Sequence, residues 1–357
     1  MNSITIYDPS AHDTLGAYRG AGRNIQALKV ALPDEARFVT DLAHVDPQDT
    51  LLIPLWRPFE KPLLTKRIAQ KQLLWLYDVI PLKYPDHFPL GIRGRWRLFQ
   101  NTRALEIYDL ILTISQHAKQ DIHDYLGIPL SKIHVLPNTS SPIYFERGRS
   151  GTTRAELVRR YGLPKGDYAL YVGDTNWNKN LPHLAQGVIE AGVTCVCVGK
   201  AFELINELRQ LPHAQQESRI ATLSHVEHTS FREFIRLVLH DEHFIFPGFV
   251  ADEDLPSLYK HAQCTVFVSY DEGYGLIFLE AATQKCPSVL ADVEVFHETA
   301  QQSALFADPD DPSAIARQIR VLFDDRKRAR HLGQDAYHRA KANSPAEFRK
   351  TLLQSLA

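Results

Sequence analysis

Two glutamates separated by seven residues flank a glycine-containing turn in the second half of the chain. The apolar run before Glu272 predicts a strand that ends at Ser269, and the segment before Glu280 predicts a helix that opens near Leu276. Glycines let backbone approach a ligand closely, and the first N–H groups of a helix lie unpaired at its positive end. The turn therefore suits a diphosphate, and its candidate binding residues are Gly273, Tyr274, Gly275 and Leu276.

The two carboxylates could bind a sugar, because sugar hydroxyls are hydrogen-bond donors that a carboxylate accepts well. The run could then hold a ribose on one glutamate, a diphosphate on the backbone and a hexose on the other glutamate. On spacing alone, a strand–turn–helix with two surface acids explains Glu272 and Glu280 equally well.

A lysine follows another predicted strand. The strand at 168–172 ends at Gly173, a helix starts after Asn180, and Lys179 lies in the loop between them, next to Asn178. A cation here would stabilise the negative charge that builds on a leaving diphosphate. The alternative is a surface lysine in a loop, which is the usual fate of this residue type.

Three glycines follow the first predicted strand. Gly16, Gly20 and Gly22 open a helix, and their spacing does not match the dinucleotide-binding fingerprint. They could let backbone approach a phosphate or a sugar, and Arg19 and Arg23 are candidates to contact a phosphate. A helix N-terminus packed tightly on a strand explains the glycines equally well.

A repeated strand–helix pattern must position these residues. Short apolar runs alternate with helix-period segments such as 180–191 and 277–284, and the alternation occurs twice, with a break at 140–150. The pattern predicts an α/β protein with two doubly wound, Rossmann-like domains facing each other across a cleft. Ligands of such sheets bind at the carboxyl ends of the strands. The expected strands are 4–7, 37–40, 51–54, 73–77, 110–114, 133–136, 168–172, 194–198, 244–246, 264–268 and 288–290.

The run from Ser269 to Glu280 resembles the Glu-x7-Glu signature of retaining GT-B glycosyltransferases, chiefly glycosyltransferase family four. The resemblance implies that Glu272 approaches the donor sugar and that Glu280 approaches the nucleotide ribose. Residues 307–316 resemble the segment that follows the signature in this family.

Two loops resemble the same family. The segment 247–259 resembles the one whose loop meets the nucleobase, which makes Gly248 and Phe249 candidate donor-binding residues. The glycine-rich segment 16–24 resembles a loop that closes over donor and acceptor.

The chain departs from the family at two positions. The run 171–181 resembles a Gly-x4-Arg-Lys-Asn-Leu pattern whose cations hold the donor diphosphate; Lys179 matches, but Asn178 stands at the arginine position. Tyr77 stands at the histidine position of a His-Asp-x-Ile-Pro segment, and Asp78 remains at the end of a buried run to face the acceptor hydroxyl.

The resemblance implies a retaining hexosyltransferase. It would move a hexose, mannose or rhamnose, from a nucleotide-diphosphate sugar to a glycan or lipid-linked acceptor in polysaccharide or lipopolysaccharide biosynthesis. Glu272, Lys179 and Asp78 are the expected catalytic residues. Asn178 and Tyr77 leave open a catalytically inactive GT-B scaffold or regulatory subunit of a partner glycosyltransferase, and a phosphorylase or sugar-nucleotide epimerase is a further alternative.

Three segments are expected in the domain organisation. Residues 1–145 would form an N-terminal acceptor-binding domain, and residues 146–335 would form a C-terminal donor-binding domain. Residues 336–357 are expected to form a helix that packs back on the N-terminal domain.

A basic stretch lies in the first half of the chain. Between Arg57 and Arg103 there are ten Lys or Arg residues and three acids, interleaved with Trp56, Trp75 and Trp96. The patch could face anionic lipid or a phosphorylated acceptor, and a solvated face is the alternative. The net charge of -2 gives the protein no overall electrostatic attraction for nucleic acid, so no nucleic-acid partner is expected.

Cysteine usage and hydropathy indicate the compartment. Cys195 and Cys197 point to one face of a predicted strand, and the four cysteines fit buried thiols in a reducing cytosol. With no signal-peptide pattern and no apolar run of ~18 residues, we expect a cytoplasmic protein, at most peripheral at the inner face of the membrane. The histidine pairs 225/228 and 240/243 lack a third ligand, so no metal or other cofactor is expected.

Overall fold

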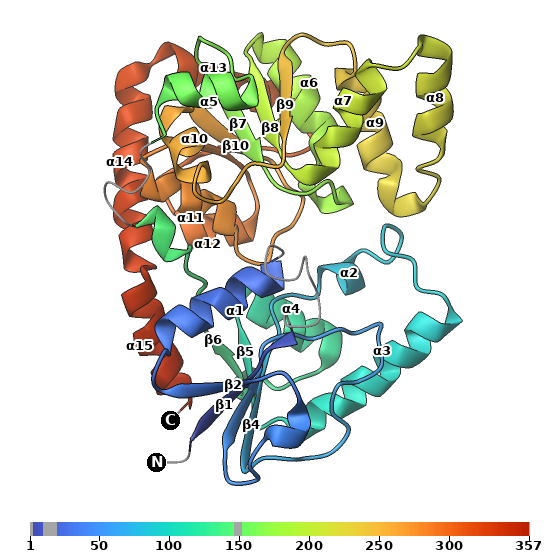
Figure 1. Cartoon of the computed structure of the whole chain (residues 1–357), viewed down its shortest axis with the longest axis vertical. Helices are drawn as coiled ribbons and strands as arrows, with labels where there is room; N and C mark the ends of the chain where they lie inside the picture. Colours follow the sequence, from blue (N-terminus) through green and yellow to red (C-terminus); the bar gives the residue numbers. More distant parts are fainter. Residues whose placement is uncertain (1–2, 10–19, 146–151, 357) are drawn as a thin grey trace. The chain divides into compact units, whose positions relative to one another are not determined.

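The computed structural model describes residues 3–9, 20–145 and 152–356. The chain divides into two compact units, Met1–Pro142 together with Asn343–Ala357, and Ile143–Ala342 (Figure 1). The sequence placed the corresponding boundaries after residues 145 and 335. Among the described residues, no helix is long and apolar enough to cross a membrane.

The first unit is built on a six-stranded parallel sheet with the order β2-β1-β3-β4-β5-β6. Runs of leucine and isoleucine form its central strands, since a parallel sheet covered on both faces buries every side chain. The strands are β1 (Ile4–Tyr7), β2 (Ala36–Val39), β3 (Thr50–Ile53), β4 (Lys71–Trp75), β5 (Leu110–Thr113) and β6 (Ile133–Val135).

Helices cover this sheet, and the last helix of the chain belongs to the same unit. The helix α15 packs against α1, and the Phe348 ring stacks on Trp75 of β4 with 5.8 Å between ring centroids. The helices are α1 (Gly20–Ala31), α2 (Ile80–Lys83), α3 (Ile92–Ala104), α4 (Gln116–Leu126) and α15 (Pro345–Leu356), with 3-10 turns η3 (Leu42–His44), η4 (Leu105–Ile107) and η5 (Leu130–Lys132).

The second unit has a parallel sheet with the order β12-β11-β10-β7-β8-β9. The strand order reverses between β7 and β10, and such a reversal opens a ligand crevice at the carboxyl ends of the two strands. The sequence missed β12, whose three residues form an edge strand. The strands are β7 (Ala169–Val172), β8 (Cys195–Val198), β9 (Phe244–Gly248), β10 (Cys264–Phe267), β11 (Ser288–Ala291) and β12 (Leu305–Ala307).

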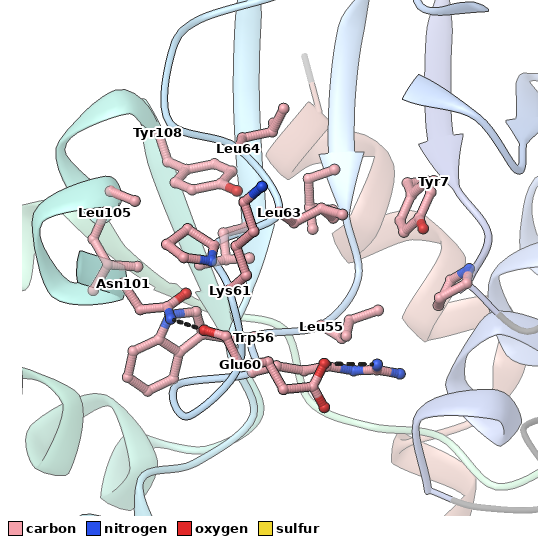
Figure 2. Close-up of a pocket in the computed structure, with 16 residues that line it drawn as sticks. Tyr7, Leu55, Trp56, Glu60, Lys61, Leu63, Leu64, Asn101, Leu105 and Tyr108 are labelled. Atoms are coloured by element: carbon pink, nitrogen blue, oxygen red, sulfur yellow. Dashed lines mark hydrogen bonds and ion pairs between the residues drawn. The ribbon is translucent and has the colours of Figure 1, made fainter. Parts of the chain in front are cut away.

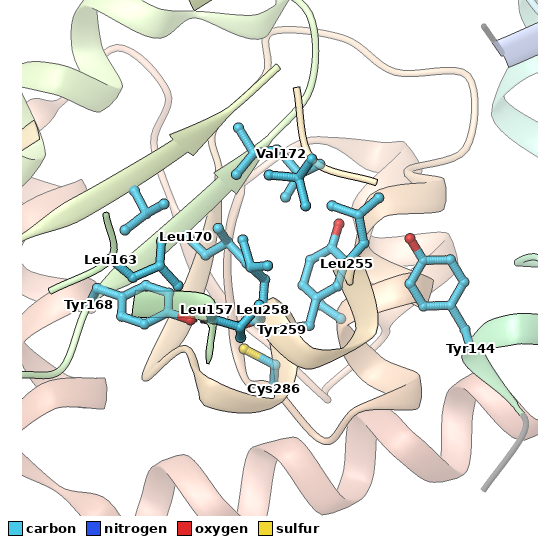
Figure 3. Packing of buried hydrophobic residues seen from close by; sticks show 14 residues of the cluster. Tyr144, Leu157, Leu163, Tyr168, Leu170, Val172, Leu255, Leu258, Tyr259 and Cys286 are labelled. Carbon is cyan, nitrogen blue, oxygen red and sulfur yellow. Dashed lines mark hydrogen bonds between the residues drawn. The ribbon is translucent and has the colours of Figure 1, made fainter. Parts of the chain in front are cut away.

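The helices of the second unit enclose its core. One buried cluster packs Leu170 and Val172 of β7 against Leu258 and Tyr259, with Cys286 nearby (Figure 3). The helices are α5 (Arg154–Tyr161), α6 (Leu181–Ala191), α7 (Glu203–Arg209), α8 (His213–Ala221), α9 (Thr229–Val238), α10 (Leu255–His261), α11 (Leu276–Thr283), α12 (Glu294–Ala300), α13 (Pro312–Asp324) and α14 (Arg326–Ala342). The 3-10 turns are η6 (Pro142–Tyr144), η7 (Trp177–Lys179), η8 (Lys200–Phe202) and η9 (Val226–His228).

The cysteines lie inside the second unit as free thiols. The sulfur atoms of Cys195 and Cys197 are 3.8 Å apart, which confirms that both side chains point to one face of β8. Burial raises the pKa of the Cys197 thiol well above its usual value, so this thiol is held in its unreactive, protonated form.

Candidate functional site

The loops that follow β7 and β10 meet because these two strands are neighbours at the centre of the second sheet. Lys179 ends η7 in the first loop, and Glu272 lies in the second. Lys179 Nζ donates to Glu272 Oε1 at 2.7 Å, and the two side chains are 14% and 15% exposed. The fold thus joins a cation and a carboxylate that lie far apart in the sequence.

The Glu272 carboxylate is held by more than the lysine. Ser269 Oγ donates to the same oxygen, Oε1, at 2.8 Å. The Glu272 N–H donates to Asp271 Oδ1 at 2.8 Å, which fixes the backbone of the loop. These contacts define the orientation of Glu272 at the carboxyl ends of β7 and β10, so its carboxylate is preorganised rather than freely rotating.

Two asparagines join the loops. Asn178 is buried, its Nδ2 donates to the Asp271 carbonyl at 3.0 Å, and its own carbonyl accepts from the Tyr270 N–H at 2.8 Å. Asn180 donates from Nδ2 to the Val268 carbonyl at 3.0 Å. The residue at the family's arginine position therefore braces the loop that carries Glu272.

A glycine is required at the start of α11. Gly275 has a φ of 82°, and a Cβ placed there would lie 2.6 Å from a ring carbon of Phe296. Gly273 and Tyr274 are buried in the same turn, and burial raises the pKa of the Tyr274 hydroxyl. The helix begins at Leu276, so its first backbone N–H groups follow this turn directly.

The second glutamate of the pair has a different environment. Glu280 lies in the second turn of α11, and only 2% of it is exposed. Its Oε2 accepts from the Tyr259 hydroxyl of α10 at 3.1 Å. The two glutamates therefore differ, since Glu272 is paired with a cation in a loop and Glu280 is enclosed between two helices.

Three glycines end the adjacent strands β7, β8 and β9. The Gly199 N–H donates to the Gly248 carbonyl at 3.0 Å, and a Cβ at Gly199 would lie 2.3 Å from the Gly173 carbonyl oxygen. The exposed Phe249 follows, and its N–H donates to Glu203 Oε1 at 3.2 Å. Gly199 and Glu203 were not predicted from the sequence, although a glycine directly after an apolar run was a usable signal.

The glycine-rich segment of the first unit is only partly described. Gly16 and Arg19 lie outside the described residues, as does the side chain of Arg23. The helix α1 begins at Gly20, and Gly22 is buried in its first turn.

Asp78 and Tyr77 follow β4 of the first unit. Asp78 Oδ1 accepts from the Ile80 N–H at 3.1 Å, in the turn that leads into α2. The Tyr77 hydroxyl donates to the Pro54 carbonyl, and burial raises the pKa of this hydroxyl. Tyr77 is therefore a neutral donor with a backbone partner, which is a different role from that of a titrating histidine.

A charged cluster in the first unit was not singled out from the sequence. Lys83 Nζ of α2 donates to Asp121 Oδ2 of α4 at 2.6 Å, and His117 Nε2 lies 3.4 Å from the same oxygen. All three side chains are largely buried. The cluster fixes α2 against α4 and so supports the backbone that carries Asp78.

Residues 154–339 match the model of the family described as glycosyl transferases group 1. O-antigen chain mannosyltransferase B of Escherichia coli is 27% identical over 261 residues, which cover 72% of this chain and 62% of that protein. O-antigen chain mannosyltransferase RfbU of Salmonella typhimurium is 24% identical over 257 residues, which cover 71% and 62%. The matched regions thus span less than two thirds of these curated relatives.

Solved structures share the fold. Anabaena HepE, solved in complex with UDP-glucose, has a TM-score of 0.67 at 15% identity and covers 100% of this chain and 99% of its own. Sucrose-phosphate synthase of Thermosynechococcus elongatus has a TM-score of 0.63 at 17% identity, with coverages of 96% and 78%. The predicted α/β architecture of two Rossmann-like, GT-B-type domains is confirmed. Because the family model matches more than half of the chain, the protein belongs to the glycosyl transferases group 1 family.

Proposed function

We propose that the chain is a retaining glycosyltransferase of the family-four type. It transfers a hexose, mannose or rhamnose, from a nucleotide-diphosphate sugar to a hydroxyl of a glycan or lipid-linked acceptor in surface-polysaccharide assembly. The observation that carries the proposal is the pairing of Lys179 with Glu272 at the strand-order reversal of the second sheet. Two O-antigen mannosyltransferases among the relatives support mannose as the first sugar to test.

The donor would bind along the carboxyl ends of the second sheet. The exposed Phe249 and the backbone at Gly248 would meet the nucleobase, and Glu280 would accept from the ribose hydroxyls after the Tyr259 contact rearranges. The diphosphate would lie between Lys179 and the first turn of α11, where a cation and the positive end of a helix favour an anion.

The transfer step needs charge stabilisation more than a protein base. The acceptor oxygen forms a bond to the anomeric carbon while the bond from that carbon to the diphosphate oxygen breaks. The electron pair of the broken bond stays on the diphosphate, where Lys179 stabilises it. The acceptor proton passes to the departing phosphate oxygen, so the atoms and charges balance without a metal or another cofactor. Asp78 would orient the acceptor hydroxyl.

A nucleotide screen tests the donor site first. The purified protein would be melted with GDP, UDP, dTDP and ADP, each with and without Mg²⁺. A ligand at a hundredfold excess over its Kd stabilises the folded state by ~2.7 kcal/mol. One nucleotide should raise the melting temperature with no effect of Mg²⁺, whereas no shift with any nucleotide would contradict the donor site.

Asn178 favours a second candidate, a GT-B scaffold that binds nucleotide without transferring a sugar. Its amide braces the loops, so the second cation of the family pattern is absent from this position. Release of free nucleoside diphosphate from a GDP-sugar only when an acceptor is added would support transfer. Nucleotide binding with no turnover on any acceptor would support the scaffold.

A further inference from the structure

The helix α3 of the first unit presents its apolar side chains to the outside. Ile92, Trp96 and Phe99 lie on one face, because residues spaced by three and four align along a helix. They are 89%, 57% and 49% exposed. A contiguous exposed apolar stripe of this kind marks an interaction surface rather than scattered surface residues.

The exposed rings are ordered against one another. The rings of Trp96 and Phe99 stack with 5.6 Å between centroids. Arg103 follows Phe99 by one helical turn on the same face, and its guanidinium lies 5.1 Å from the Phe99 ring centroid. The stripe is therefore a preformed aromatic surface with a cation at its end.

The opposite face of α3 attaches it to the protein through a polar residue. The buried Asn101 donates from Nδ2 to the carbonyls of Glu60 at 2.8 Å and Pro58 at 3.1 Å. The usual amphipathic arrangement, with apolar residues inward and polar residues outward, is thus reversed at these positions. Exposing these three apolar side chains while burying Asn101 does not stabilise the folded state in water.

The charge around the stripe has one sign. The helix contains four arginines and no acid, and Arg93, Arg95 and Arg103 are exposed. Arg93 and Arg95 project on either side of the apolar stripe, as the helical period requires. Cations that flank an aromatic stripe complement the phosphates of an anionic lipid surface.

The loop that carries Leu63 lies beside the opposite face of α3, which contains Asn101. Leu63 and Lys61 are exposed, and they line a pocket of about 100 Å³ together with Asn101 (Figure 2). The pocket is too small for a nucleotide-sugar, since ligand pockets of that class occupy ~300–1,000 Å³.

Of the three tryptophans that the sequence placed in the basic patch, Trp75 is fully buried in the central strand β4, so the prediction that it belongs to the patch was wrong.

We propose that the exposed face of α3 forms a docking surface for an anionic lipid bilayer. Ile92, Trp96 and Phe99 would enter the interfacial region, and the flanking arginines would bind lipid phosphates while their stems cover the apolar boundary. The one-sign charge argues for lipid over a second copy of this chain, because two α3 helices would bring eight arginines together. The helix would lie in the membrane plane.

Vesicle flotation of the full chain tests the surface. Wild-type protein should float with phosphatidylcholine–phosphatidylglycerol vesicles and not with phosphatidylcholine alone, and added salt should weaken the binding. The triple variant Arg93→Gln/Arg95→Gln/Arg103→Gln should bind about a hundredfold more weakly, since each interfacial cation contributes about fivefold. A Trp96→Ser/Phe99→Ser variant should lose flotation while its melting temperature stays unchanged.

Matched variants separate this surface from general stickiness. Tyr125→Ser removes an equally exposed aromatic ring from α4, and Lys327→Gln/Arg328→Gln removes exposed cations from α14. Both should float like the wild type. Flotation unchanged in the two α3 variants would overturn the proposal. So would wild-type protein that fails to float but forms dimers, by light scattering, that the α3 substitutions dissociate.

Discussion

Lys179 Nζ lies 2.7 Å from Glu272 Oε1, and the two residues come from loops that follow adjacent central strands. Glu272 also accepts from Ser269 Oγ, and its own N–H donates to Asp271 Oδ1, so the carboxylate is held by its own loop as well as by the lysine. An incoming diphosphate would compete with the glutamate for the lysine head. The pair therefore holds the cation in position before the donor binds.

Removal of the cation should affect transfer more than folding. Lys179→Ala is expected to lower kcat by about a hundred- to thousandfold, because one electrostatic donor to a developing anion contributes ~2.7–4 kcal/mol. Initial rates of labelled sugar transfer at saturating donor measure this loss. Lys165→Ala removes an exposed lysine elsewhere in the same unit and should leave the rate unchanged.

Glu272 and Lys179 should behave as a coupled pair. Glu272→Ala and Lys179→Ala remove the same contact, so the double variant should lose less than the sum of the two single losses in free energy. A double-mutant cycle on kcat measures the coupling. Strict additivity would show that the ion pair plays no part in transfer.

Asn178 should matter through the loops that it joins. Asn178→Ala leaves the Asp271 carbonyl without this donor, and an unmet buried acceptor costs about 1–3 kcal/mol of unfolding free energy. The rate should also fall, by less than in Lys179→Ala, as Glu272 becomes less well fixed. Urea unfolding checks the first effect, with Asn176→Ala as an exposed control two residues away. Equal stability of the two variants would refute the brace.

The sequence indicated that the loops carrying Lys179 and Glu272 lie at the same edge of the sheet, but it did not indicate most of the contacts around them. Glu272 and Lys179 could be found because a turn after a strand has a local signature, and strand alternation then brings the two loops together. The enclosure of Glu280 beside Tyr259 could not be found, since α10 and α11 meet only through tertiary packing. The exposed face of α3 was hidden for the same reason: periodicity shows an apolar stripe but not whether it faces inward.

Gly275 should tolerate no side chain. Gly275→Ala introduces a Cβ at a φ of 82° and 2.6 Å from the Phe296 ring. The left-handed backbone alone costs about 1–2 kcal/mol, and the contact adds to it. Unfolding in urea should show the loss. Gly166→Ala is the matched control, because no heavy atom lies within 4 Å of its added Cβ and its φ is not positive.

Asp254 should give the second unit an acid-sensitive stability. Burial acts to raise the pKa of its carboxyl, but donation from Thr152, Tyr161 and Arg160 outweighs burial and lowers the pKa below its usual value. A carboxyl with a lower pKa in the folded state stabilises the fold above its unfolded pKa, about 3.9, and this contribution disappears as the pH falls through the folded pKa.

The substitution Asp254→Asn should isolate that contribution. At about pH 7 the variant should unfold more easily by about 2 kcal/mol, the scale of hydrogen bonds to a charged group. Below about pH 4 the wild type binds fewer protons folded than unfolded, so its stability should fall toward that of the variant. Urea unfolding followed by circular dichroism across this range measures the convergence. Glu242→Gln, at an exposed position, should instead follow the wild-type curve at every pH, and parallel curves for Asp254→Asn and the wild type would refute the role of the carboxylate.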